Sequence, residues 1–239
     1  MFDRIKKAFL RDVTVAGTAA AKATATATSS TAAIDGPVSE WAAAQGFIFS
    51  SQGSAQKFSI QGKVRGKLWR MELGHSSRNY ISGEELRGRA ELGIKEKVAV
   101  MVMSRSLKER LEKQAYSKYT DSLQTEGDPD LPEELRWLAM FEEVGWDGLP
   151  NEFWTRYSVL TDRRDNATEW LAPSLVFQLL QWPAPGPVAT APFILMLMRG
   201  KAYLRMQYQP ADVATLQHAT EIFTHACELA IDKLTKASP

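Results

Sequence analysis

The sequence predicts an α+β protein: a mainly antiparallel sheet built from hairpins, packed against several helices, with a flexible N-terminal extension. Three observations lead to this fold class. Apolar and polar side chains alternate over much of residues 57–92, which is the period of half-buried strands. Two Arg-Gly pairs separate neighbouring strand-like stretches, and glycine supplies the positive φ of tight hairpin turns. Other stretches repeat their apolar residues at the helical spacing of three and four.

Residues 1–13 are expected to form a short amphipathic basic helix. On a helical wheel its large apolar residues lie on one side and most of its basic residues on the other. Asp3 and Asp12 argue against a secretory signal, whose first region is normally basic. The residues expected to contact a membrane or a protein partner are Phe2, Ile5, Lys6, Lys7, Phe9 and Leu10.

Residues 14–34 contain fifteen alanines or threonines and are predicted to be a disordered linker. Such a stretch can hardly bury enough surface to offset its ordering entropy. A flexible chain of this length has an end-to-end distance of roughly 25 Å. Residues 35–239 are then expected to form a single α+β domain, or two halves at 35–120 and 131–239.

Within the first half, the period of the apolar residues changes from helical to strand-like after Gly46. Ser106 and Glu109 have the spacing of a capping box, which predicts a helix start close to residue 107. In chain order, the expected elements are a helix at 37–46, strands at 57–64, 67–73, 85–92 and 98–103, and a helix at 107–119.

The second half is expected to be richer in helices. Pro132 is a favourable first residue for a helix, and Pro173 is expected to split a longer helical stretch. Arg199 and Gly200 lie in the turn of a second predicted hairpin. In chain order, the expected elements are a helix at 132–141, a strand at 153–160, helices across 165–182, strands at 193–198 and 202–208, and a helix at 211–235.

The motifs that carry common chemistries are absent from the sequence, and no metal or other cofactor is expected. His218, Glu221, His225 and Glu228 share a helical face, but that face is simply the polar side of an amphipathic helix. Cys227 lies near the apolar side, as a packed thiol would. A non-catalytic protein is therefore favoured. The alternative is a small enzyme or ligand-binding domain with a pocket between sheet and helices.

The charge is distributed unevenly along the chain. Residues 1–120 hold 20 Lys or Arg against 11 Asp or Glu, whereas residues 121–239 hold 9 against 17. This asymmetry suggests an anionic partner for the first half or pairing between the halves, although alternation alone also places charges on a solvated strand face. The candidate residues for an anionic partner are Lys63, Arg65, Lys67, Arg70, Arg87 and Arg89. The loop 74–78 could also bind a small anion.

These features predict a non-catalytic binding or adaptor protein, localised by residues 1–13 to a membrane surface or a larger protein assembly. The short helix should bind weakly alone, since ordering roughly ten residues costs about as much as burying its few apolar side chains gains. A second contact is needed, from the basic sheet, a protein groove or homo-oligomerisation. Nucleic acid is the third alternative, disfavoured because Phe58 and Trp69 are expected to point inward. The single cysteine fits a cytoplasmic protein, with peripheral membrane attachment as one form of the hypothesis.

Overall fold

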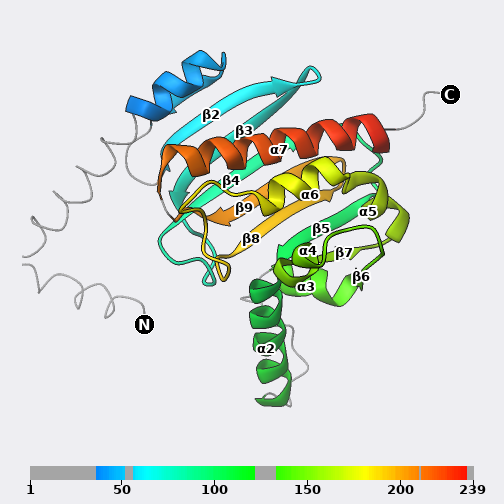
Figure 1. Cartoon of the computed structure of the whole chain (residues 1–239). Helices are drawn as coiled ribbons and strands as arrows, with labels where there is room; N and C mark the ends of the chain where they lie inside the picture. The colour runs from blue at the N-terminus through cyan, green and yellow to red at the C-terminus, as the bar shows by residue number, and fades with distance from the viewer. Residues whose placement is uncertain (1–35, 52–55, 122–132, 210, 236–239) are drawn as a thin grey trace, which may run out of the picture.

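A computed structural model of the chain describes residues 36–51, 56–121, 133–209 and 211–235. The predicted fold class is confirmed: the described residues form an α+β structure around one nine-stranded sheet, in which every neighbouring pair is antiparallel (Figure 1). The strands are β1 (Ile48–Ser51), β2 (Gln56–Val64), β3 (Lys67–His75), β4 (Glu84–Glu91), β5 (Ala99–Ser104), β6 (Glu142–Val144), β7 (Tyr157–Thr161), β8 (Phe193–Met198) and β9 (Lys201–Gln207).

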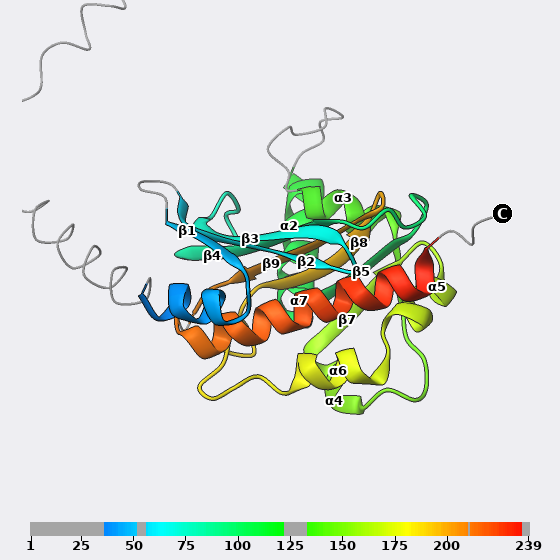
Figure 2. The same cartoon turned by 90° about the horizontal axis from the view of Figure 1, so that it is seen from above.

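Helices lie on both faces of this sheet. The long C-terminal helix crosses one face together with α5 and α6, and α2 and α3 lie on the other (Figure 2). Residues 36–44 are also helical. The remaining helices are α2 (Arg105–Asp121), α3 (Glu133–Met140), α4 (Asn151–Arg156), α5 (Arg164–Trp170), α6 (Pro173–Leu180) and α7 (Val213–Leu234).

The strand order is β1-β2-β3-β4-β9-β8-β5-β7-β6, so the C-terminal hairpin β8–β9 lies in the middle of the sheet. Both Arg-Gly turns form as predicted. Arg65 and Gly66 have φ of 48° and 76°, and Arg199 and Gly200 have 51° and 76°. Two successive positive φ values are typical of the type I′ turn, whose twist matches that of the flanking strands. The turn therefore fixes the register of each hairpin.

The main core lies between the sheet and α7. Alternate residues of the central strands point toward this helix, including the predicted apolar positions of β2, β3 and β4. Gly88 of β4 leaves room for the ring of Phe223, which is fully buried. Trp170 of α5 is also fully buried, and its indole N–H donates to the carbonyl oxygen of Ala226 at 2.9 Å. These contacts hold α5 and α7 over one face of the sheet.

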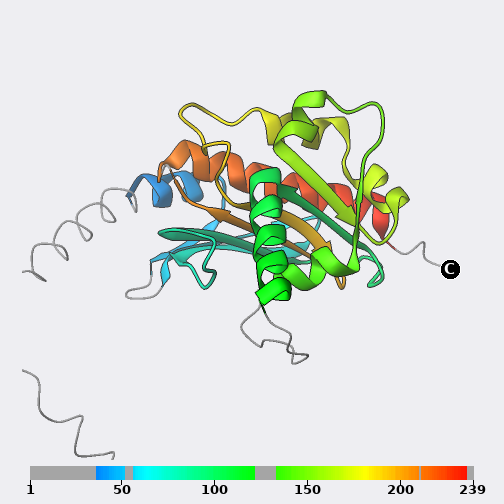
Figure 3. The ribbon, with the colours of Figure 1, turned by 90° about the horizontal axis from the view of Figure 1, so that it is seen from below.

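The helices among the described residues cover only part of the opposite face. A second apolar cluster joins β5, β7 and β8 to α2 and α3, and includes Met101, Met103, Leu107 and Leu135. In the view from below, α2 lies in front of the sheet with α3 beside it (Figure 3). Strands β2, β3 and β4 carry polar and charged residues on this face, and we call their surface, with that of β9, the open face.

Four expectations differ from the observed elements. Strands β1 and β6 were not predicted, because both are short edge strands without clear alternation. Residues 153–156 belong to helix α4 and not to a strand; the aromatic residues Phe153 and Trp154, which favour strands, pack here from a helix. The first long helix begins at Arg105, directly after β5. Ser106 therefore cannot be its N-cap residue.

The N-terminus of α7 offers a direct test of helix capping. Asp212 is the N-cap residue, and its carboxylate accepts hydrogen bonds from the backbone N–H and the hydroxyl of Thr215 at 2.8 and 2.9 Å. We expect Asp212→Ala to lower the free energy of unfolding by about 1 kcal/mol, because it removes these bonds and a favourable charge at the helix start. Urea denaturation measures the change. Asp212→Asn should retain most of the stability, and equal losses would contradict a capping role.

Candidate functional site

The register of the sheet aligns one transverse row of side chains on the open face. Directly opposed residues on neighbouring antiparallel strands lie on the same face. From β1 to β7 the row is Ile48, Gln61, Arg70, Arg89, Tyr203, Met196, Met101 and Leu160. The row is therefore charged over β3 and β4 and apolar from β8 onward.

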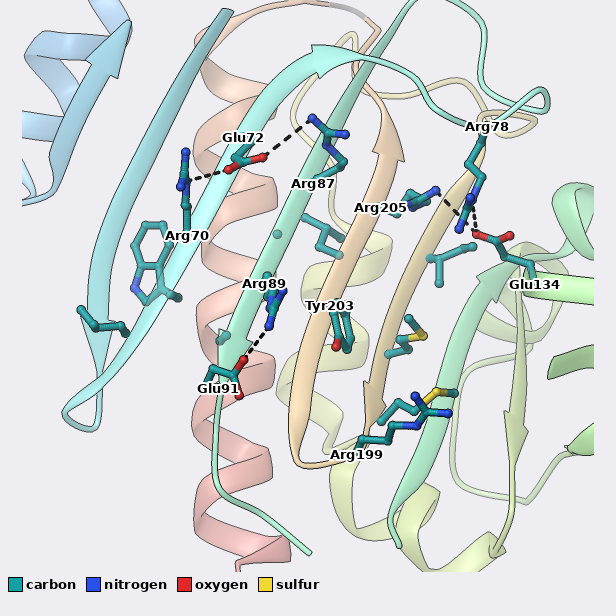
Figure 4. A pocket seen from close by; sticks show the side chains of 18 of the residues that line it. Arg70, Glu72, Arg78, Arg87, Arg89, Glu91, Glu134, Arg199, Tyr203 and Arg205 are labelled. Atoms are coloured by element: carbon teal, nitrogen blue, oxygen red, sulfur yellow. Dashed lines mark hydrogen bonds and ion pairs between the residues drawn. The ribbon is translucent and has the colours of Figure 1, made fainter. Parts of the chain in front are cut away.

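A hollow of about 660 Å³ lies on this face, over β3, β4, β9 and β8, with α3 at its border. We call it the arginine hollow, because six arginines and only three glutamates line it. Figure 4 shows these charged side chains on β3, β4 and β9, in the loop after β3, in the turn after β8 and on α3. The arginines are Arg70, Arg78, Arg87, Arg89, Arg199 and Arg205, and the glutamates are Glu72, Glu91 and Glu134.

Two pairs of these arginines are directly opposed across neighbouring strands. Arg70 of β3 is opposite Arg89 of β4, and Arg87 of β4 is opposite Arg205 of β9. Like charges in directly opposed positions destabilise a sheet. An anion bound beside Arg70 and Arg89 would relieve the repulsion of that pair.

The carboxylates on the charged side of the hollow are shared between cations. Glu72 lies 2.7 Å from Nε of Arg70 and 3.8 Å from Nη2 of Arg87. Glu91 lies 2.7 Å from Arg89 and 2.9 Å from Lys201. The Nε–H of Arg87 is buried and has no acceptor among the described residues. Positive charge and at least one donor are therefore left over for a ligand.

At the α3 end of the hollow, by contrast, the charges balance in a buried cluster. Glu134 of α3 is 1% exposed and accepts hydrogen bonds from Nε of Arg78 at 2.9 Å and from the hydroxyl of Tyr80 at 2.7 Å. Arg205 lies 3.6 Å from Glu134 and 3.0 Å from the fully buried Glu85. Two arginines thus meet two glutamates. This cluster fastens α3 and the loop after β3 to the sheet.

The electrostatics of the cluster follow from its burial. Burial raises the pKa of the Tyr80 hydroxyl, and the neighbouring Glu134 carboxylate raises it further. Burial alone would lower the pKa of Arg78, but the charge of Glu134 and the hydrogen bond to it raise the pKa overall. Tyr80 therefore remains a neutral donor and Arg78 remains a cation at every physiological pH.

The other side of the hollow is apolar. Ile194 and Met196 of β8 are buried at its floor, while Met198, Trp137 and Tyr203 are half-buried around it. Tyr203 lies between the two sides, because it is opposite Arg89 on one neighbouring strand and Met196 on the other. The hollow therefore joins a cationic surface to a hydrocarbon surface within one small site.

The structure gathers three of the six residues predicted for an anionic partner. Arg70, Arg87 and Arg89 line the arginine hollow, and Lys63 is exposed on β2 outside it. Lys67 is opposite the core residue Val64, so it points toward the α7 side; Arg65, in the β2–β3 turn, pairs with Asp232 of α7 at 3.2 Å. The predicted contact residues Phe2, Ile5, Lys6, Lys7, Phe9 and Leu10 lie outside the described residues.

Sequence reasoning missed the contribution of the second half of the chain. Arg199, Tyr203 and Arg205 come from the β8–β9 hairpin, and Glu134 and Trp137 come from α3. The alternation in β9 does indicate which of its residues share a face, but not that β9 pairs with β4. Arg78 was singled out within loop 74–78, and it does reach the hollow, whereas His75 does not line it.

The histidines of α7 have structural partners. His218 Nε2–H donates to the backbone carbonyl of Gln178 at 2.8 Å, and His225 Nδ1–H donates to the side-chain oxygen of the same residue at 2.6 Å. These bonds fasten α6 to α7, on the face away from the arginine hollow. Among the described residues, no group of three or more His, Cys, Asp or Glu is placed to hold a metal ion.

Cys227 provides a second test of the structure. Its side chain is fully buried, and burial raises the pKa of the thiol, with a further contribution from nearby Glu228. Because the thiolate is the reactive form, we expect no reaction with a thiol reagent at pH 8 in the folded protein and complete reaction in urea. The chain holds one cysteine, so the signal is unambiguous. Rapid modification of the folded protein would contradict this placement.

No helix within the described ranges is both long and apolar enough to cross a bilayer.

Comparisons with known proteins add no family. No protein-family model matches the chain, and no curated protein matches it. Among solved structures, the chain is similar to the crystal structure of the mycobacterial trehalose monomycolate transport factor A, TtfA, with 12% sequence identity and a TM-score of 0.47. The match covers 86% of this chain and 97% of that one. A similarity this weak carries no argument about what this chain binds.

Proposed function

We propose that this chain is a non-catalytic binding or adaptor protein whose domain takes an anionic partner in the arginine hollow. The observation that carries this proposal is the two directly opposed arginine pairs of the hollow, Arg70 with Arg89 and Arg87 with Arg205. Arginine suits this role because its planar guanidinium binds carboxylate and phosphate groups through two parallel hydrogen bonds.

Residues 1–13 complete the proposal as a localising segment. Their predicted amphipathic helix would bring the domain to an anionic membrane surface, or to a larger protein assembly, with residues 14–34 as the tether. The helix of residues 1–13 and the arginine hollow are each expected to bind weakly and reversibly, as single membrane anchors do. Two weak contacts joined by a tether give a much higher combined affinity, because the second binds at a high effective concentration.

Co-sedimentation with vesicles tests the localising role. We expect the full chain to pellet with vesicles of phosphatidylcholine and phosphatidylserine, and to remain in solution with phosphatidylcholine alone. A chain that starts at Ile34 should pellet less. Equal pelleting of the two chains would remove the membrane role of residues 1–13, and absence of pelleting would leave the protein-assembly form of the proposal.

Nucleic acid is the second candidate partner, because Tyr203 and Trp137 give the hollow the aromatic surface that the sequence did not indicate. Aromatic side chains beside arginines are what single-stranded nucleic acids stack on. Affinity for an oligonucleotide should then fall steeply with salt concentration. Absent or salt-insensitive binding in a filter or anisotropy assay would dispose of this candidate.

A further inference from the structure

The two unlike sides of the arginine hollow lie a short distance apart. Arg89, Tyr203 and Met196 are consecutive members of one transverse row, on β4, β9 and β8. Neighbouring strands are about 4.8 Å apart, so roughly 10 Å separates the arginine strand from the methionine strand. A single small molecule can therefore contact the cationic side and the apolar side at once.

We propose that the arginine hollow binds a small anionic amphiphile, a molecule with one acidic head group and one hydrocarbon chain. The head group lies against Arg70, Arg87 and Arg89. The chain extends past Tyr203 toward Met198 and Trp137. This inference rests on the proposed function, because it names the class of anion that the binding protein takes.

The head-group side is suited to one compact acidic group. Arg70 and Arg89 are directly opposed, and each shares its carboxylate, Glu72 or Glu91, with a further cation. The buried Nε–H of Arg87 still lacks an acceptor among the described residues. A phosphate or carboxylate group between these strands supplies that acceptor and reduces the repulsion between the arginines.

The apolar side calls for hydrocarbon. Met198, Trp137 and Tyr203 remain half-buried around the hollow, so a ligand that covers them gains hydrophobic free energy. Methionine side chains are flexible and adapt to chains of different shape. A purely ionic ligand such as inorganic phosphate would leave these three side chains as they are.

The size of the hollow favours a small molecule as its occupant. Its volume of about 660 Å³ lies within the range of roughly 300–1,000 Å³ that is typical of small-molecule sites. Residues 1–13 of this chain, or of a second copy, are disfavoured because four basic against two acidic residues give them the same sign of charge as the hollow. Charge complementarity thus selects an acidic ligand.

Isothermal titration calorimetry of the full chain tests the inference, with every amphiphile kept below its critical micelle concentration. The probes are dodecyl phosphate, dodecanoate, inorganic phosphate and dodecyl maltoside. We expect dodecyl phosphate or dodecanoate to bind at least tenfold more tightly than both other probes. A preference for the phosphate points to a phospholipid-like source, and a preference for the carboxylate to a fatty acid.

The outcomes separate this inference from the proposed function. If inorganic phosphate binds as tightly as dodecyl phosphate, the hollow is an anion site and the amphiphile inference is overturned, while the proposed function stands. If dodecyl maltoside binds as tightly as dodecyl phosphate, charge does not select the ligand and the inference also fails. If none of the probes binds, the amphiphile inference is overturned. If anionic vesicles do not bind either, the membrane form of the proposed function fails as well.

Variants assign the two sides of the ligand. Arg70→Gln combined with Arg89→Gln should weaken dodecyl phosphate binding at least tenfold and leave the melting temperature unchanged or higher, because a repulsive pair is removed. Met198→Thr, which keeps a strand-forming residue on β8, should weaken dodecyl phosphate but not inorganic phosphate. The matched control is Arg163→Gln, at the start of α5, where the side chain is 71% exposed. An equal loss in the control would overturn the assignment.

Discussion

Glu134→Ala is expected to lower the free energy of unfolding by about 3 kcal/mol. Glu134 is 1% exposed and is the shared partner of Arg78, Arg205 and the hydroxyl of Tyr80. Removing one partner of a buried ion pair typically costs about 3–5 kcal/mol, because the remaining charge stays buried without compensation. The lower end applies here, since the Arg78 and Arg205 side chains keep 24% and 22% exposure. Urea denaturation monitored by circular dichroism measures the loss.

Glu91→Gln is the matched control, because Glu91 also lines the arginine hollow and contacts two cations. Its side chain is 60% exposed, and exposed ion pairs contribute at most about 1 kcal/mol. Glu134→Gln should fall between the two, since an amide oxygen can still accept from Tyr80 without carrying charge. If Glu91→Gln destabilised the protein as much as Glu134→Ala, the division of the hollow into a structural end and a ligand-binding side would be wrong.

The contrast between these two glutamates was not visible in the sequence. Glu134 lies next to an acidic stretch between two helices, where a carboxylate is ordinarily solvated. Its burial depends on α3 packing beside Tyr80, which lies 54 residues earlier in the chain. Local patterns carry no information about a contact over this separation. The same holds for Arg205 and Glu85, whose pairing requires β9 to lie beside β4.

Patterns of neighbouring residues did predict the features that depend on neighbouring residues, namely strand faces and tight turns. Alternation fixed the faces of β2, β3 and β4, so the residues expected to be apolar in those strands are the ones beneath α7. The two Arg-Gly turns were predicted from glycine alone, and both adopt positive φ. Where the prediction of elements was wrong, at residues 153–156, strand-favouring aromatic residues were placed in a helix by packing. Tertiary contacts overrode propensity there.

In the candidate site, too, some arginines could be predicted from local patterns and others could not. Arg70, Arg87 and Arg89 could be assigned to one face from alternation, because β3 and β4 follow each other along the chain. Arg199 and Arg205 could not, because the β8–β9 hairpin enters the sheet between β4 and β5. The predicted basic surface was therefore half of the hollow. Its apolar half follows only from the strand order.

Phe223→Ala is expected to be the other strongly destabilising change, with a loss of about 3–5 kcal/mol in the free energy of unfolding. The Phe223 side chain is fully buried between α7 and the sheet. Large-to-small substitutions in a core lose both the transfer free energy of the removed atoms and the contacts around the resulting cavity. The ring of Phe223 packs against Gly88 of β4. Because glycine has no side chain, it cannot fill the cavity that the removed ring would leave. Urea denaturation gives the loss, and a change below about 1 kcal/mol would contradict this packing.

Gly88→Ala tests the same contact from the sheet side. A Cβ at residue 88 would lie 3.0 Å from Cβ of Leu204 and 3.2 Å from the Phe223 ring, which is tighter than ordinary packing. We expect a loss of about 1–3 kcal/mol from overpacking. Adding Phe223→Leu should cost less in this background than in the wild type, with a coupling of about 0.5–3 kcal/mol, because the two side chains are in contact. Additive losses would show that β4 and α7 do not meet at this point.

Residue 88 lies between Arg87 and Arg89 but points away from them. The folded fraction of Gly88→Ala should therefore bind anions as the wild type does. That result would show that residue 88 supports the strand and does not contact the ligand.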